Sequence, residues 1–130
     1  LKPSTVSKFS SENGCGIKAI EAHNLGTEND SLPGDVYIGY FRTLPGADEI
    51  KGRNYFIVCN ALTSGNGLHP EQQHGSSRET AQSITLTFGE SEKELFLVNG
   101  KNGQSEKATL ENGQYTFELG GGEMQVFYLA

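Results

Sequence analysis

Alternation of apolar and polar residues with a period of two recurs along nearly the whole chain and limits what it can fold into. The stretch SITLTF at 83–88 shows the pattern most clearly, because Ile84, Leu86 and Phe88 alternate with small hydroxyl-bearing residues. A period of two is that of a β-strand with one face in a core and the other toward water. Helical spacing is almost absent, so the sequence predicts an all-β fold.

Seven further stretches have the same strand-like character. They are IKAIEAH, GDVYIGYF, NYFIVCNAL, ELFLVNG, EKATL, QYTFEL and EMQVFYL. In the first, Ile17 and Ala19 are expected on one face. NYFIVCNAL is apolar on both faces, which indicates a strand in the middle of a sheet that is packed on both sides. Asn-Gly pairs at 99–100, 102–103 and 112–113 tolerate the positive φ of tight turns. These signals predict an antiparallel two-sheet β-sandwich of about seven or eight strands.

The domain organisation follows from length. At 130 residues and 14.1 kDa the chain is expected to form one domain, 1–130, with enough residues for a single core. A polar loop at 63–80 interrupts the strand rhythm, and loops of that length are usually functional or disordered. Because the chain begins at Leu1 and not at Met, we expect it to be a processed product or a piece excised from a longer polypeptide.

Charge and cysteine content limit the partners. The formal net charge is -6, with pI near 5.0, and the cations are scattered, so we expect neither nucleic acid nor membrane as a partner. No apolar run approaches the length of a membrane span or a signal-peptide core. Cys15 and Cys59 permit one disulfide, and the sequence leaves open whether they pair or are two buried thiols.

The triple glycine at 120–122 has two interpretations. A phosphate-binding glycine loop leads from a strand into a helix N-terminus, where free N–H groups face the anion. Here the glycines lie between QYTFEL and EMQVFYL, two strand-like runs, and no Gly-Lys-Ser or Gly-Lys-Thr follows. The sequence therefore predicts a hairpin corner in which glycine supplies positive φ.

Two loops carry residues that metals bind. His69 and His74 lie in the long loop with a spacing unlike that of a helical HExxH site, and solvated histidines are the plain alternative. Glu28, Asp30 and Asp35 offer the hard oxygens that Ca²⁺ prefers, but ordered EF-hand spacing is missing and an acidic loop is the alternative. We expect no cofactor, with Ca²⁺ as the one ion to test.

Neither a catalytic centre nor a strong sugar-stacking surface is visible. There is no GxSxG elbow and neither cysteine stands in a reactive context, so we expect no enzymatic activity in this domain. Sugar rings usually stack on exposed flat aromatics, and Trp is absent. Tyr37, Tyr40 and Tyr55 are the best candidates for ligand binding, with core packing as the alternative.

Four stretches together carry a family resemblance: GDVYIGYFRTLPG, NYFIVCNAL, SITLTF and YTFELGGGEMQVFYL. They resemble C-terminal β-sandwich domains of secreted bacterial glycoside hydrolases, especially those of gut Bacteroidetes. The matching residues are Gly39, Phe41, Tyr55, Phe56, Val58, Asn60, Thr85, Phe88, Leu119, Gly120, Gly122 and Glu123. The resemblance covers residues 35–130. It implies a sandwich that packs beside a catalytic barrel, does no chemistry itself, and is secreted, periplasmic or on the cell surface.

Two hypotheses follow. The first is a non-catalytic accessory domain of an exported carbohydrate-active enzyme, which packs against the catalytic domain of the same polypeptide or assists polysaccharide binding. It predicts an exposed apolar patch. The second is an autonomous glycan-binding module that uses the 63–80 loop, with His69 and His74, and exposed tyrosines. A small hydrolase is the weakest alternative, because no nucleophile or metal arrangement supports it.

Overall fold

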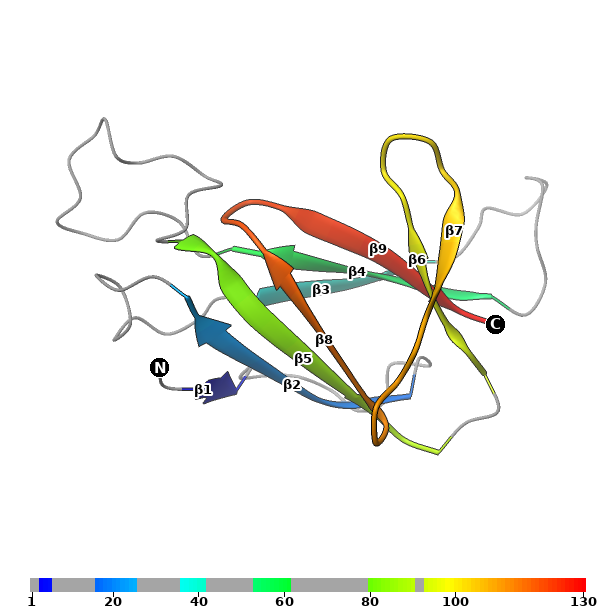
Figure 1. Cartoon of the computed structure of the whole chain (residues 1–130), viewed down its shortest axis with the longest axis horizontal. Helices are drawn as coiled ribbons and strands as arrows, with labels where there is room; N and C mark the ends of the chain where they lie inside the picture. Colours follow the sequence, from blue (N-terminus) through cyan, green and yellow to red (C-terminus); the bar gives the residue numbers. More distant parts are fainter. Residues whose placement is uncertain (1–2, 6–15, 26–35, 42–52, 62–79, 91–92) are drawn as a thin grey trace, which may run out of the picture.

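The structure, a computed structural model, describes residues 3–5, 16–25, 36–41, 53–61, 80–90 and 93–130. These segments contain nine strands (Figure 1): β1 (Pro3–Thr5), β2 (Ile17–Asn24), β3 (Val36–Phe41), β4 (Asn54–Asn60), β5 (Gln82–Phe88), β6 (Leu95–Val98), β7 (Ser105–Ala108), β8 (Gln114–Leu119) and β9 (Met124–Leu129). None of the described segments forms a helix that could span a membrane.

The strands form two antiparallel sheets that pack face to face, which confirms the predicted β-sandwich (Figure 1). Sheet A has the order β1-β2-β5-β8, and sheet B the order β3-β4-β9-β6-β7. All eight expected strands are present. The ninth is β1, a three-residue strand that pairs with β2 at residues 21–23. Strand β4 lies between β3 and β9, as its apolar character on both faces predicted.

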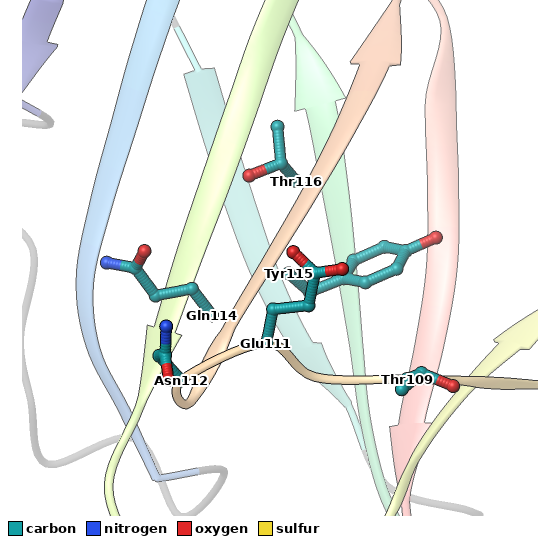
Figure 2. A pocket seen from close by; sticks show the side chains of 6 residues that line it. All are labelled: Thr109, Glu111, Asn112, Gln114, Tyr115 and Thr116. Atoms are coloured by element: carbon teal, nitrogen blue, oxygen red, sulfur yellow. The ribbon is translucent and has the colours of Figure 1, made fainter.

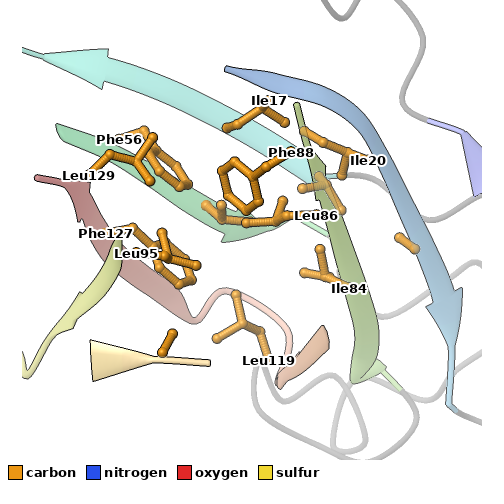
Figure 3. Close-up of a cluster of buried hydrophobic side chains, with 14 residues drawn as sticks. Ile17, Ile20, Phe56, Ile84, Leu86, Phe88, Leu95, Leu119, Phe127 and Leu129 are labelled. Atoms are coloured by element: carbon orange, nitrogen blue, oxygen red, sulfur yellow. The ribbon is translucent and has the colours of Figure 1, made fainter. Parts of the chain in front are cut away.

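Both sheets contribute equally to the core between them (Figure 3). Sheet A provides Ile17, Ile20, Ala22, Ile84, Leu86, Phe88 and Leu119; sheet B provides Val36, Phe56, Val58, Leu95, Ala108, Phe127 and Leu129. Within the core the fully buried rings of Phe56 and Phe127 stack with centroids 5.0 Å apart. The alternation at 83–88 therefore predicted the buried face of β5 correctly.

One strand face was predicted wrongly. We expected Ile17 and Ala19 on the same face of β2, but the pairing with β5 shifts register between them. This irregularity places Ile20 and Ala22 in the core with Ile17, while Ala19 is only half-buried. A bulge adds one residue to one strand, so it reverses the alternation beyond it. No signal in IKAIEAH marks that position.

The triple glycine forms a corner, but not that of a hairpin. It joins β8 of sheet A to β9 of sheet B, so the chain changes sheets there. The amide of Glu123 donates to the carbonyl of Gly120 (3.0 Å), and Gly122 has a φ of 78°. That φ is a conformation that glycine adopts without steric cost. Because the glycines lead from one strand into another, they do not form the strand-to-helix connection of a phosphate-binding glycine loop.

A buried polar cluster ties the two sheets together beside that corner. The Asn60 side chain, on sheet B, donates from Nδ2 to the carbonyls of Thr80 and Leu119, both at 2.8 Å. Its Oδ1 accepts a 2.6 Å hydrogen bond from Nε2 of Gln82 on sheet A. Asn60, Thr80 and Gln82 have no exposed surface. Because buried amides are costly unless hydrogen-bonded, this cluster fixes the relative position of the sheets.

Candidate functional site

The outer face of sheet B, which points away from the core, is mostly apolar. Residues directly opposite each other in neighbouring antiparallel strands lie on the same face, so the register defines it. Phe41 lies opposite Tyr55, Tyr55 opposite Tyr128, and Tyr128 opposite Phe96. We call the outward-facing apolar set the aromatic face: Tyr37, Phe41, Tyr55, Ile57, Cys59, Phe96, Val98, Met124, Val126 and Tyr128.

Four rings form one row across β3, β4, β9 and β6. Phe41 and Tyr55 stack with centroids 5.5 Å apart, and Tyr128 and Phe96 stack at 4.9 Å. Between these pairs, Tyr55 and Tyr128 are tilted by 51° at 5.5 Å. Each inner ring therefore has an aromatic neighbour on either side, and such pairs stabilise a sheet beyond the area they bury.

Arg53 covers the middle of this row. Its guanidinium carbon lies 4.2 Å from the centroid of the Tyr128 ring, and Nη1 donates a long 3.3 Å hydrogen bond to the Tyr55 hydroxyl. The hydrogen bond to Tyr55 raises the pKa of the Arg53 guanidinium, so the group stays cationic at any physiological pH. Tyr128 is only 3% exposed. This part of the outer face is packed like a core, although it lies outside the sandwich.

Toward β3 the side chains of the aromatic face become more exposed to solvent. Ile57, Val126 and Val98 form a half-buried second row, and Gly39 lies opposite Ile57. The exposed fraction is 70% for Tyr37, 58% for Met124 and 44% for Phe41. Exposed large apolar side chains gathered on one face mark an interaction surface more often than scattered ones do. The predicted apolar patch is therefore present in the described part of the chain.

The three predicted tyrosines do not all lie together. Tyr37 and Tyr55 belong to the aromatic face. Tyr40 lies opposite Phe56, hence on the other side of β3, and is 42% exposed near the end of that strand. Sequence reasoning missed Phe96, Tyr128 and Arg53. The available signal was that the alternate residues of NYFIVC and MQVFYL are apolar too, which predicts a second apolar face.

The remaining predicted site residues lie outside the described residues: His69, His74, Glu28, Asp30 and Asp35. In the described part of the chain no three His, Cys, Asp or Glu side chains gather where they could hold a metal ion. Cys59 is a free, half-buried thiol on the aromatic face, and Cys15 is not among the described residues.

A polar hollow of about 360 Å³ lies beside the turn that leads into β8 (Figure 2). It is lined by Thr109, Glu111, Asn112, Gln114, Tyr115 and Thr116. Asn112 and Gly113 adopt positive φ, as their Asn-Gly pair predicted. Burial raises the pKa of the Tyr115 hydroxyl, and the negative charge of Glu106 raises it further. The described residues that line it offer hydroxyl, amide and carboxylate groups, and none of them carries a positive charge.

Comparison of the chain with family models, with curated proteins and with solved structures finds no match.

Proposed function

We propose that this chain is a non-catalytic accessory β-sandwich domain whose aromatic face packs against a neighbouring protein domain. The observation that carries the proposal is the aromatic face itself. Tyr, Phe, Met and Arg are the residue types enriched at the centres of protein interfaces. Here Tyr37, Phe41, Met124 and Arg53 supply these types on one side of one sheet.

Ring orientation favours a protein partner over a polysaccharide. A pyranose ring stacks on a free aromatic face, but the rings of the row turn their faces toward one another or, at Tyr128, toward Arg53. A protein surface, by contrast, fills the spaces around the ring edges and the side chains of Tyr37 and Met124. Contact of this kind is typical of domains within one chain.

The partner that we propose is the catalytic domain of the same polypeptide, in an exported carbohydrate-active enzyme of the type found in Bacteroidetes. The resemblance of residues 35–130 to accessory domains of secreted glycoside hydrolases supports this choice. The roles of two of the matching residues are compatible with it, because Asn60 joins the sheets and Gly122 shapes a corner. These are scaffold positions, as expected of a domain whose neighbour does the chemistry.

The first test is the mass of the native polypeptide, measured by immunoblot of secreted and envelope fractions from the source organism. We expect a band several times larger than 14.1 kDa. A band near that mass would exclude a catalytic domain in the same polypeptide.

Oxidative footprinting then tests the face. Met124 is the only methionine of the chain and is 58% exposed, so its oxidation reports directly on coverage. We expect slower oxidation of Met124 in the native polypeptide than in the 130-residue chain. His23, which points outward from sheet A opposite Ser83, is the internal control and should label equally in both. Equal oxidation of Met124 in the two samples would contradict the proposal.

A second candidate function is binding of a glycan. Two observations favour it: the 70% exposure of Tyr37, and the polar hollow beside β8 with its amide, hydroxyl and carboxylate groups. A single exposed ring makes a small stacking platform, which is why this function ranks second. Titration with a panel of oligosaccharides, followed by NMR, tests it. Saturable shifts at Tyr37 or Gln114 would favour a glycan-binding module, and their absence would leave the scaffold.

A further inference from the structure

Among the described strands, four lie at the edges of the two sheets, and they differ in how they are protected against pairing. An exposed edge offers backbone N–H and C=O groups to another strand, and proteins usually protect it with charges, proline or short length. Edge strand β1 has three residues and begins with Pro3; β7 has four and contains Glu106 and Lys107. Edge strand β8 contains Glu118. Each of these three carries at least one protective feature.

Strand β3 has none of these features. Its six residues, VYIGYF, include no charge and no proline. In sheet B it pairs only with β4 among the described strands. All three of its aromatic side chains are exposed: Tyr37, Tyr40 and Phe41. A six-residue segment that is uncharged, rich in β-formers and at an edge is the kind of strand to which another strand adds.

The hydrogen-bonding pattern shows which backbone groups point outward. The N–H and C=O of Asn60 bond to Glu123 and Gly122, toward β9. Along an antiparallel strand these directions alternate, so Tyr55, Ile57 and Cys59 bond toward β3. Their partners are Phe41, Gly39 and Tyr37, respectively. The intervening residue Ile38 therefore directs its N–H and C=O to the side of β3 where no other described strand pairs.

The outward face of β3 is complementary to itself. Tyr37 is the most exposed large apolar residue of the described chain, and two residues further on Gly39 has no side chain. In an antiparallel pair with a two-fold axis at Ile38, Tyr37 of each copy lies opposite Gly39 of the other. An aromatic ring over a cross-strand glycine is a favourable pair at a sheet edge. Since β3 is uncharged, it adds no repulsion of its own between two copies of net charge -6.

We propose that two copies of this chain associate through β3, antiparallel and about a two-fold axis at Ile38, so that their two B sheets become one continuous sheet. Ile38 of each copy donates to the carbonyl of Ile38 of the other, and the aromatic faces continue across the axis. A contact this narrow belongs to the class of small, reversible interfaces. The inference is independent of the proposed packing against another domain.

The first part of the test measures mass. Analytical ultracentrifugation of the full 130-residue chain, from about 1 μM to about 1 mM, should show reversible conversion from 14.1 kDa to twice that mass. Tyr37→Lys places a charge on the edge and removes both Tyr37–Gly39 contacts, so we expect the dissociation constant to rise about tenfold. The matched control is Ser105→Lys on β7, the opposite and exposed edge of the same sheet. This variant should keep the dissociation constant of the dimer within about twofold of the wild-type value.

The second part of the test measures hydrogen exchange of backbone amides and does not depend on any variant. Hydrogen exchange of the Ile38 amide should be fast in dilute wild-type chain and slow down as concentration rises, because the second copy covers that amide. The Gly39 amide, which bonds toward β4, should be protected throughout. Three results would each overturn the proposal: a monomer over the whole range, loss of the dimer in Ser105→Lys, or protection of Ile38 that dilution does not remove.

Discussion

The outer faces of the two sheets differ although the sheets share one core. On sheet A the outward row is polar: the hydroxyls of Thr85 and Thr116 lie 2.9 Å apart, and Gln114 donates to Thr87 at 3.2 Å. On sheet B the corresponding surface is the aromatic face, with Tyr128 almost fully buried. A face that water covers needs only polar residues, so an apolar face requires another explanation.

The difference shows that sheet B stabilises the fold on both sides, whereas sheet A does so on one. Truncating one residue on each outer face tests this difference between the sheets. Tyr128→Ala removes a ring that is 3% exposed and packed against Tyr55, Phe96 and Arg53. We expect the free energy of unfolding to fall by about 3 to 5 kcal/mol.

Thr116→Ala is the partner substitution on sheet A, where the side chain is exposed. This substitution should change the free energy of unfolding by no more than about 0.5 kcal/mol. Urea unfolding of both variants, followed by far-UV circular dichroism, gives the two values. Equal effects would mean that the aromatic face contributes no more to the fold than the polar one, and the contrast between the faces would be lost.

A second substitution tests the link that holds both faces in their places. Asn60→Ala removes three hydrogen bonds that join β4 to Thr80, Gln82 and Leu119. We expect a loss of about 2 to 4 kcal/mol, because buried polar groups then lose a partner away from water. The Tyr128 ring current shifts, read by NMR, should change little, since Asn60 lies on the inner side of β4. If Asn60→Ala left the free energy of unfolding unchanged, the apolar core alone would fix the relative position of the two sheets.

The sequence predicted the sandwich, eight of its nine described strands and the turns at Asn-Gly pairs, because alternation and turn chemistry are local. It did not predict the bulge after Ile17, which depends on pairing with Phe88 and Thr87. The aromatic face was predicted only in part. Tyr37 and Tyr55 were named, but the row with Tyr128 depends on which strands are neighbours, and β9 joins β4 across 63 intervening residues of chain between Asn60 and Met124.

The polar face offers a smaller test of the comparison. Thr85→Val combined with Thr116→Val replaces the exposed hydroxyl pair by methyl groups of similar shape. Since the hydroxyls already contact water, we expect a change of at most about 0.5 kcal/mol in unfolding free energy. Thermal and urea unfolding measure it. A loss above about 2 kcal/mol would show that this face also stabilises the fold, through a specific hydroxyl network.

The smallest expected effect concerns pH and arises at Tyr115, between the polar hollow and the core. Burial, and then the charge of Glu106, raise the pKa of its hydroxyl above the ordinary value near 10. As pH rises, Tyr115 loses its proton at a lower pH in the unfolded chain than in the folded one. The free energy of unfolding therefore decreases above about pH 10. The contribution of Tyr115 to stability is therefore complete below about pH 10 and declines as pH approaches the folded-state pKa.

Tyr115→Phe is the matched variant, because it keeps the ring contacts with Phe117 and Phe127 and removes only the ionisable group. Unfolding midpoints in urea, measured from about pH 8 to about pH 11, should fall less steeply above pH 10 in Tyr115→Phe than in the wild type. Glu106→Gln should give an intermediate slope, because one of the two causes of the raised pKa is then removed. Identical slopes in all three chains would mean that Tyr115 ionises as readily in the folded domain as in the unfolded chain. The hydroxyl would then be fully solvated, and the polar hollow would be continuous with bulk water at this point.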